Sequence, residues 1–123
     1  MRRTALELEA SRHGGRRRAR QFRELVRETI DAMPALYATN DGRQALRDFV
    51  AASSRCVAWG GVRHLRWYVG LVRDLYEAGQ DDPERALCTY GLLPLAESIL
   101  VRDALYVAAI PVSYTHLTLP TKA

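Results

Sequence analysis

The chain of 123 residues is predicted to form an all-α domain, a small bundle of about four to six helices. Along most of the chain, apolar residues recur at steps of three and four, which is the period of a helix with one buried face. No segment alternates with period two, and no hairpin signal such as Asn-Gly occurs. The length suits one domain, and the 48% apolar content is sufficient for a buried core.

Two helices are expected before residue 35. Residues 4–12 form a short one, which Gly14-Gly15 ends. A longer helix begins at Arg16, and Pro34 ends or kinks it because proline disfavours the helical conformation in the residue before it. Its apolar stripe consists of Phe22, Leu25, Val26, Ile30 and Met33.

Two further helices are expected on either side of Gly60-Gly61. Residues 38–42 form a turn in which Asn40 or Asp41 is the expected N-cap of a helix over 43–59. After the glycine pair, residues 62–78 form the most regular helix of the chain, with Gly79 as its C-cap. Its buried stripe consists of Val62, Leu65, Val69, Val72 and Tyr76.

The last helices are expected after residue 82. Asp82 is a suitable N-cap and Pro83 suits the first helical position, so a helix should run from Pro83 to about Leu93. Pro94 then kinks it or starts another. Residues 94–110 are apolar on most faces, which is typical of a central helix in a bundle.

The chain is expected to divide into three regions. Residues 1–15 are a basic, candidate flexible segment, 16–110 are the helical domain, and 111–123 are a separate tail. Residues 1–27 hold nine Arg against three Glu, whereas 28–111 carry a net charge of −3. No apolar run approaches the roughly 20 residues of a membrane span, and the N-terminus has no signal-peptide core. A cytoplasmic protein is expected, with Cys56 and Cys88 reduced and buried.

The tail differs in composition from the rest of the chain. All seventeen basic residues from 1 to 111 are Arg, as a GC-rich genome favours, and Lys122 is the only Lys. The stretch VSYTHLTLPT (112–121) resembles the translation of the transposase adapter used in DNA-sequencing libraries, whose frame GTC TCT TAT ACA CAT CTG ACG CTG CCG ACG encodes these ten residues. This resemblance extends to residue 122 and implies a non-native tail on a truncated reading frame. Tyr114 and His116 are then not site residues, and the tail should be extended or loosely attached.

An arginine cluster in residues 12–23 is the first candidate site. It consists of Arg12, Arg16, Arg17, Arg18, Arg20 and Arg23. Guanidinium groups pair with phosphates in a planar fork and release counterions, so the cluster is a candidate surface for nucleic acid or an acidic partner. The alternative is a solvated first turn of a helix. Because positive charge at a helix N-terminus opposes the helix dipole, stability alone does not explain the cluster.

Residues 55–68 gather aromatic and Arg side chains around the glycine pair. Such side chains stack on bases. A helix–turn–helix with helices 43–50 and 62–76 is an alternative that the long intervening segment disfavours. The preferred interpretation places Trp59 and Tyr68 in the core. A candidate pocket consists of His64, Trp67 and Tyr68, between helix 62–76 and helix 94–110.

No catalytic or metal motif is recognisable, and no cofactor is predicted. A phosphate loop, H-E-x-x-H and a nucleophile elbow are all missing, and Asp81, Asp82 and Glu84 are explained by capping. The leading hypothesis is a non-catalytic helical binding or regulatory module that acts on a protein partner or forms a homo-oligomer. A nucleic-acid-binding protein and a fragment of an enzyme or ligand-pocket protein are the alternatives.

Overall fold

A computed structural model describes the backbone of residues 3–109 and the side chains of residues 6–100. It contains α1 (Arg3–Ser11), α2 (Arg16–Asp31), the 3-10 helix η1 (Pro34–Ala38), α3 (Asn40–Ala78) and α4 (Ala86–Ala109). The described residues include no strand, so the all-α prediction is confirmed. None of the described helices is long and apolar enough to cross a membrane. The predicted adapter-derived tail, with Tyr114 and His116, lies outside the described residues.

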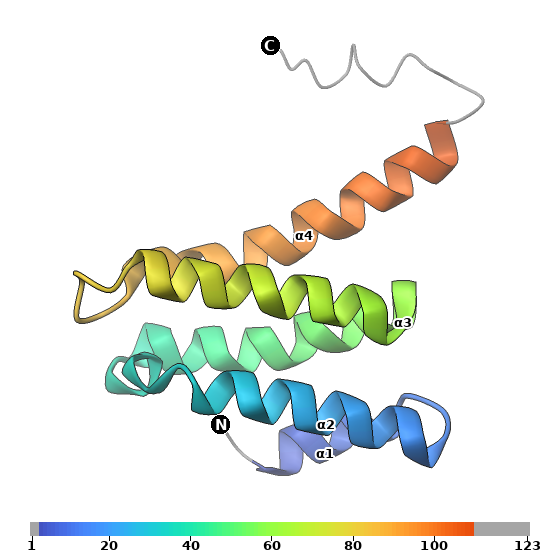
Figure 1. Cartoon of the computed structure of the whole chain (residues 1–123), viewed down its shortest axis with the longest axis horizontal. Coiled ribbons are helices and arrows are strands. Elements are labelled where there is room, and N and C mark those ends of the chain that lie inside the picture. The colour runs from blue at the N-terminus through green and yellow to red at the C-terminus, as the bar shows by residue number, and fades with distance from the viewer. Residues whose placement is uncertain (1–2, 110–123) are drawn as a thin grey trace.

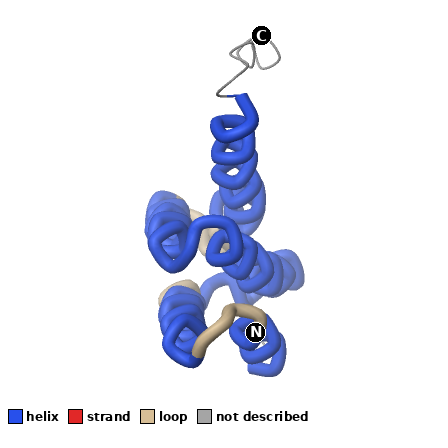
Figure 2. The backbone as a smooth tube through the Cα atoms, turned by 90° about the vertical axis from the view of Figure 1, so that its right-hand side faces the viewer, coloured by secondary structure: helices blue, strands red, loops and turns tan. Residues whose placement is uncertain are grey.

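Helix α3 is the centre of the bundle. It packs against α1, α2 and η1 on one side and against α4 on the other (Figure 1). Helices α1 and α2 form one outer layer, and the last turns of α4 extend past the other helices in both views (Figure 2). The N-terminal segment therefore contributes to the bundle, since Leu6 and Ala10 of α1 are buried.

A kink at Gly61 divides α3 into a first segment (40–60) and a second segment (62–78) that doubles back beside it (Figure 1). Gly61 has φ 76° and ψ −172°, a conformation that is essentially restricted to glycine. The predicted break at Gly60-Gly61 is thereby confirmed. The helix–turn–helix alternative is wrong, because residues 51–60 are helical and no short turn joins 43–50 to 62–76.

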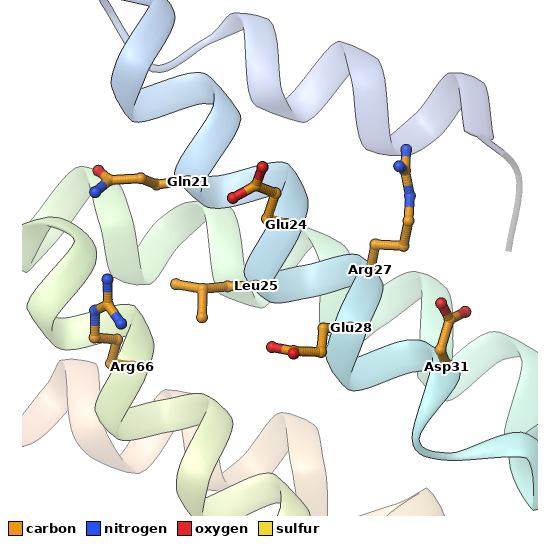
Figure 3. Close-up of a pocket in the computed structure, with 7 residues that line it drawn as sticks. All are labelled: Gln21, Glu24, Leu25, Arg27, Glu28, Asp31 and Arg66. Atoms are coloured by element: carbon orange, nitrogen blue, oxygen red, sulfur yellow. The ribbon is translucent and has the colours of Figure 1, made fainter.

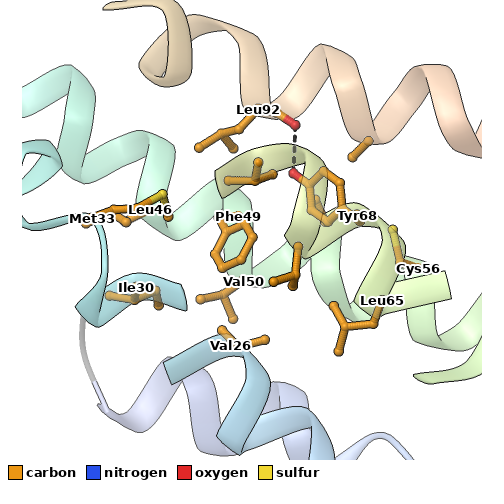
Figure 4. Packing of buried hydrophobic residues seen from close by; sticks show 14 of the residues in the cluster. Val26, Ile30, Met33, Leu46, Phe49, Val50, Cys56, Leu65, Tyr68 and Leu92 are labelled. Carbon is orange, nitrogen blue, oxygen red and sulfur yellow. Dashed lines mark hydrogen bonds between the residues drawn. The ribbon is translucent and has the colours of Figure 1, made fainter. Parts of the chain in front are cut away.

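The core lies where α2, both segments of α3 and α4 meet (Figure 4). The α2 stripe is buried as predicted at Phe22, Val26, Ile30 and Met33. Across α3, the rings of Phe49 and Tyr68 pack with centroids 5.7 Å apart. The Tyr68 hydroxyl donates a 2.6 Å hydrogen bond to the Leu92 carbonyl of α4, so a buried polar group is satisfied. Cys56 and Cys88 are buried free thiols, as expected.

The N-cap of α3 is Thr39, so the prediction of Asn40 or Asp41 was wrong. Thr39 has extended dihedrals, and its Oγ1 accepts a 2.8 Å hydrogen bond from the Gly42 amide. Asn40 is already helical. The turn before α3 is tight, since a Cβ on Gly42 would clash with the carbonyl oxygen of Leu36. The N-cap lies one residue before Asn40 and two before Asp41.

Helix α4 begins at Ala86, three residues later than predicted. Arg85 has φ 52°, which a helix cannot contain, and its guanidinium stacks 3.9 Å from the centroid of the Tyr76 ring. Asp82 still binds backbone amides, accepting from Glu84 at 3.1 Å and from Ala86 at 2.9 Å. These hydrogen bonds hold the turn before the helix. After it, α4 continues through Pro94 as one helix.

Candidate nucleic-acid interface

One end of the bundle, here called the kink end (residues 12–20 and 55–67), brings the two candidate sites of the sequence together. The turn between α1 and α2 and the kink of α3 lie at the same end in Figure 1. Two contacts connect them. His13 Nε2 lies 3.0 Å from Ser54 Oγ, and a Cβ built on Gly61 would lie 3.8 Å from Nη2 of Arg18.

Charge is segregated between the two ends of the molecule. The kink end contains eight Arg and no acidic residue. The opposite end (residues 31–41 and 74–84) contains seven acidic residues and no basic one. Arg43 and Arg85 border that acidic end, and each donates a hydrogen bond to a backbone carbonyl there. The small net charge of the chain therefore conceals a strong charge asymmetry along its long axis.

The first turn of α2 is the most basic part of the kink end. Arg16, Arg17 and Arg18 are all exposed in this turn, which has no acidic residue. Gly15 stands at the N-cap with φ 82°, and no side chain caps the helix. Backbone amides at a helix N-terminus point outward and favour an anion. Three exposed Arg side chains and an uncapped helix end thus occur in the same turn.

The rest of the arginine cluster divides into two groups. Arg20 is exposed like its neighbours. Arg12 and Arg23 instead make long ion pairs with α1, to Glu9 at 3.9 Å and to Glu7 at 3.8 Å. Exposed pairs of this length contribute little to stability, so they leave these side chains able to reorient toward a phosphate.

Two tryptophans are exposed at the kink end. Trp59 is 54% exposed and Trp67 is 43% exposed. The prediction that Trp59 belongs to the core was wrong, because Cys56 and Val57 occupy the buried face in the last turn before the kink. Large exposed aromatic rings are costly to leave in water, and interfaces are enriched in them.

Beside Trp67 lies a shallow depression of about 480 Å³, whose described lining residues are Gly60, Arg63, His64 and Trp67. The His64 ring meets Trp67 edge to face, with centroids 5.7 Å apart and an interplanar angle of 85°. It also lies directly on Gly60, where a Cβ would clash with the ring and stand 2.8 Å from the His64 Cβ. The missing side chain of Gly60 therefore makes room for the imidazole.

Tyr68 does not join this depression. Its ring is fully buried in the core and its hydroxyl donates a hydrogen bond to the Leu92 carbonyl, and burial raises its pKa. The structure thus brings together His64 and Trp67 of the predicted pocket and separates Tyr68 from them. Between the second segment of α3 and α4, the described side chains fill the space with core packing (Figure 4).

A groove of about 550 Å³ runs between α2 and the second segment of α3 (Figure 3). Glu24, Leu25 and Glu28 form the α2 wall, and Arg66 faces them from α3. The two carboxylates repel phosphate, so this groove bounds the basic surface rather than extending it. The groove was not predictable from the sequence, because its two walls are some forty residues apart.

His13 was not among the predicted site residues. The His13 ring is only 7% exposed, packed 4.9 Å from the centroid of the Phe22 ring and bonded to Ser54. Burial, and then the nearby Arg18 guanidinium, lower the pKa of His13 from 6.5. This buried imidazole connects the basic turn to α3.

The described residues contain no group of three or more His, Cys, Asp or Glu side chains that could hold a metal ion. No protein-family model matches the chain, and no curated protein or solved structure is significantly similar to it. Any function must therefore be argued from the kink end itself.

Proposed function

We propose that this chain is a non-catalytic helical binding module whose ligand is a nucleic acid held at the kink end. The observation that carries the proposal is the concentration of eight Arg, without one acidic residue, at one end of a molecule with little net charge. A polyphosphate backbone matches this surface, because each phosphate neutralised by Arg releases condensed counterions.

The first turn of α2 supports the same ligand. Arg16, Arg17 and Arg18 oppose the dipole of their own helix, at a cost of a few tenths of a kcal/mol or more per charge. A bound phosphate reverses this effect, since it accepts hydrogen bonds from the uncapped amides and pairs with the guanidinium groups. The arrangement is unfavourable in the free protein and favourable in a complex with an anion.

The proposal is tested by fluorescence anisotropy of a labelled thymidine strand over a range of salt concentrations. Binding should strengthen as salt falls, with a slope of log K against log salt of about −0.7 per phosphate contact. The triple variant R16Q/R17Q/R18Q should reduce the magnitude of this slope by about two. A matched control, R27Q/R43Q/R47Q, removes three Arg away from the kink end and should keep the slope nearly unchanged.

Two results would contradict the proposal. One is the absence of binding at low ionic strength. The other is an equal loss of affinity in the two triple variants, because that would show a response to net charge rather than to the kink end. Far-UV circular dichroism establishes that both variants remain helical.

A homo-oligomer is the second candidate, and the charge segregation favours it too. The basic kink end of one copy complements the acidic end of another, so copies would associate head to tail. Light scattering at low salt would detect this as a mass that rises with protein concentration. A constant monomer mass would exclude it, and a thymidine strand should dissociate such oligomers by competing for the kink end.

A further inference from the structure

The depression beside Trp67 combines features that suit one particular group. It has an exposed indole, an imidazole at nearly a right angle to that indole, and Arg63 among its described lining residues. A planar ring that stacks on Trp67 would meet the His64 ring with its edge. A phosphate attached to the same ligand would lie near Arg63 and the basic turn of α2.

We propose that this depression is a stacking site for one unpaired base, so that the ligand is single-stranded. This inference rests on the proposed function and adds to it the ligand class. In a duplex, base faces are covered by their neighbours, and only an unstacked base offers a face to an indole. The volume of about 480 Å³ lies within the range of small-ligand sites and suffices for a base with its sugar.

Position along α3 supports the link between stacking and phosphate binding. Trp67 lies six residues after Gly61, which is about 9 Å along the second segment. Nη2 of Arg18 lies 3.8 Å from the position of a Cβ built on Gly61, so the basic turn lies beside the kink that precedes the depression. A strand whose phosphates lie on α2 can place its next base on Trp67.

Gly60 is a positioning residue in this site. Since a Cβ there clashes with the His64 ring and lies 2.8 Å from the His64 Cβ, G60A must displace His64 and reshape the depression. No Arg of the kink end is changed by this substitution. It therefore separates base stacking from phosphate binding.

The test compares a thymidine strand with an abasic strand of equal length and equal phosphate count, at one low salt concentration. For the native protein we expect the thymidine strand to bind between about fivefold and about 150-fold more tightly. W67A should bring this ratio close to one, and G60A should lower it. W59A is the matched control, because it removes an exposed tryptophan outside the described lining, and it should keep the ratio.

Fluorescence gives an independent reading, since the chain has only two tryptophans. In W59A, the emission of Trp67 alone should be quenched by the thymidine strand and not by the abasic strand. Equal affinity of the native protein for the two strands would overturn the stacking site and leave the proposed function standing. A ratio that survives in W67A and collapses in W59A would also overturn it. If neither strand binds, the proposed function fails and the stacking site fails with it.

Discussion

The substitution G61A tests the kink on which the kink end depends. Gly61 has φ 76° and ψ −172°, which an L-residue with a Cβ adopts only with strain of about 1–3 kcal/mol. No steric clash adds to this, because the nearest atom to a Cβ built on Gly61 is Nη2 of Arg18 at 3.8 Å. We therefore expect G61A to lower the free energy of unfolding by about 1–3 kcal/mol.

G70A is the matched control. Gly70 is exposed within the second segment of α3, its φ is not positive, and a Cβ there meets no atom within 4 Å. Alanine is a better helix former than glycine, so G70A should gain about 0.5–1 kcal/mol. The same chemical change thus has opposite signs at two glycines of one helix.

Urea unfolding followed by far-UV circular dichroism measures both variants. For a domain of this size, each kcal/mol corresponds to roughly 3–5 °C in Tm. The slope of free energy against urea should be the same in both, because neither substitution changes the surface that unfolding exposes. If G61A were as stable as the native protein, the kinked conformation of Gly61 would be contradicted. The inference that the kink brings the two candidate sites together would then fail as well.

Three further predictions concern single polar groups. Y68F removes the buried hydrogen bond to Leu92 and should cost about 0.5–1.5 kcal/mol in urea unfolding. The pKa of His13 is lowered in the folded state, so the unfolded chain binds a proton first as pH falls below 6.5. The free energy of unfolding should therefore decrease as pH falls below 6.5. H13N should remove this pH dependence. Hydrogen bonds from backbone amides lower the pKa of Asp82 below 3.8, so its contribution to the free energy of unfolding should be present above that pH and lost as pH falls. In D82N the free energy of unfolding should therefore depend less on pH in acid. An unchanged dependence on pH would contradict this role of Asp82.

Much of the fold was predictable because it depends on local signals. The predicted stripes of residues 16–33 and 62–78 follow the helical period, and their members are buried except for Leu25 and Val62, which are half-buried. Gly61 was recognisable as a break because a glycine pair interrupts two such stripes. Where the start of a helix depended on backbone dihedral angles, the predicted start was wrong by one to three residues. This happened at Thr39, the N-cap of α3, and at Arg85, the residue before α4.

The candidate site was predictable only in its parts. The arginine cluster is contiguous in sequence, so it was visible at once. Its proximity to Trp67 was not, because this depends on the reversal of α3 at the kink. Trp59 was misplaced since aromatic content alone does not tell which face of a helix is buried. Tyr68 was grouped with His64 and Trp67, but its ring is fully buried in the core and lies outside the described lining of the depression.

The central claim is that a nucleic acid binds at the kink end, and an NMR titration with a short thymidine strand tests it most directly. Backbone amide shifts should change in residues 12–20 and 55–67, together with both indole N–H signals, and these changes should diminish as salt is added. Residues 31–41 and 74–84 should be unaffected. Shifts that centre on this acidic end, or no shifts at low salt, would contradict the claim.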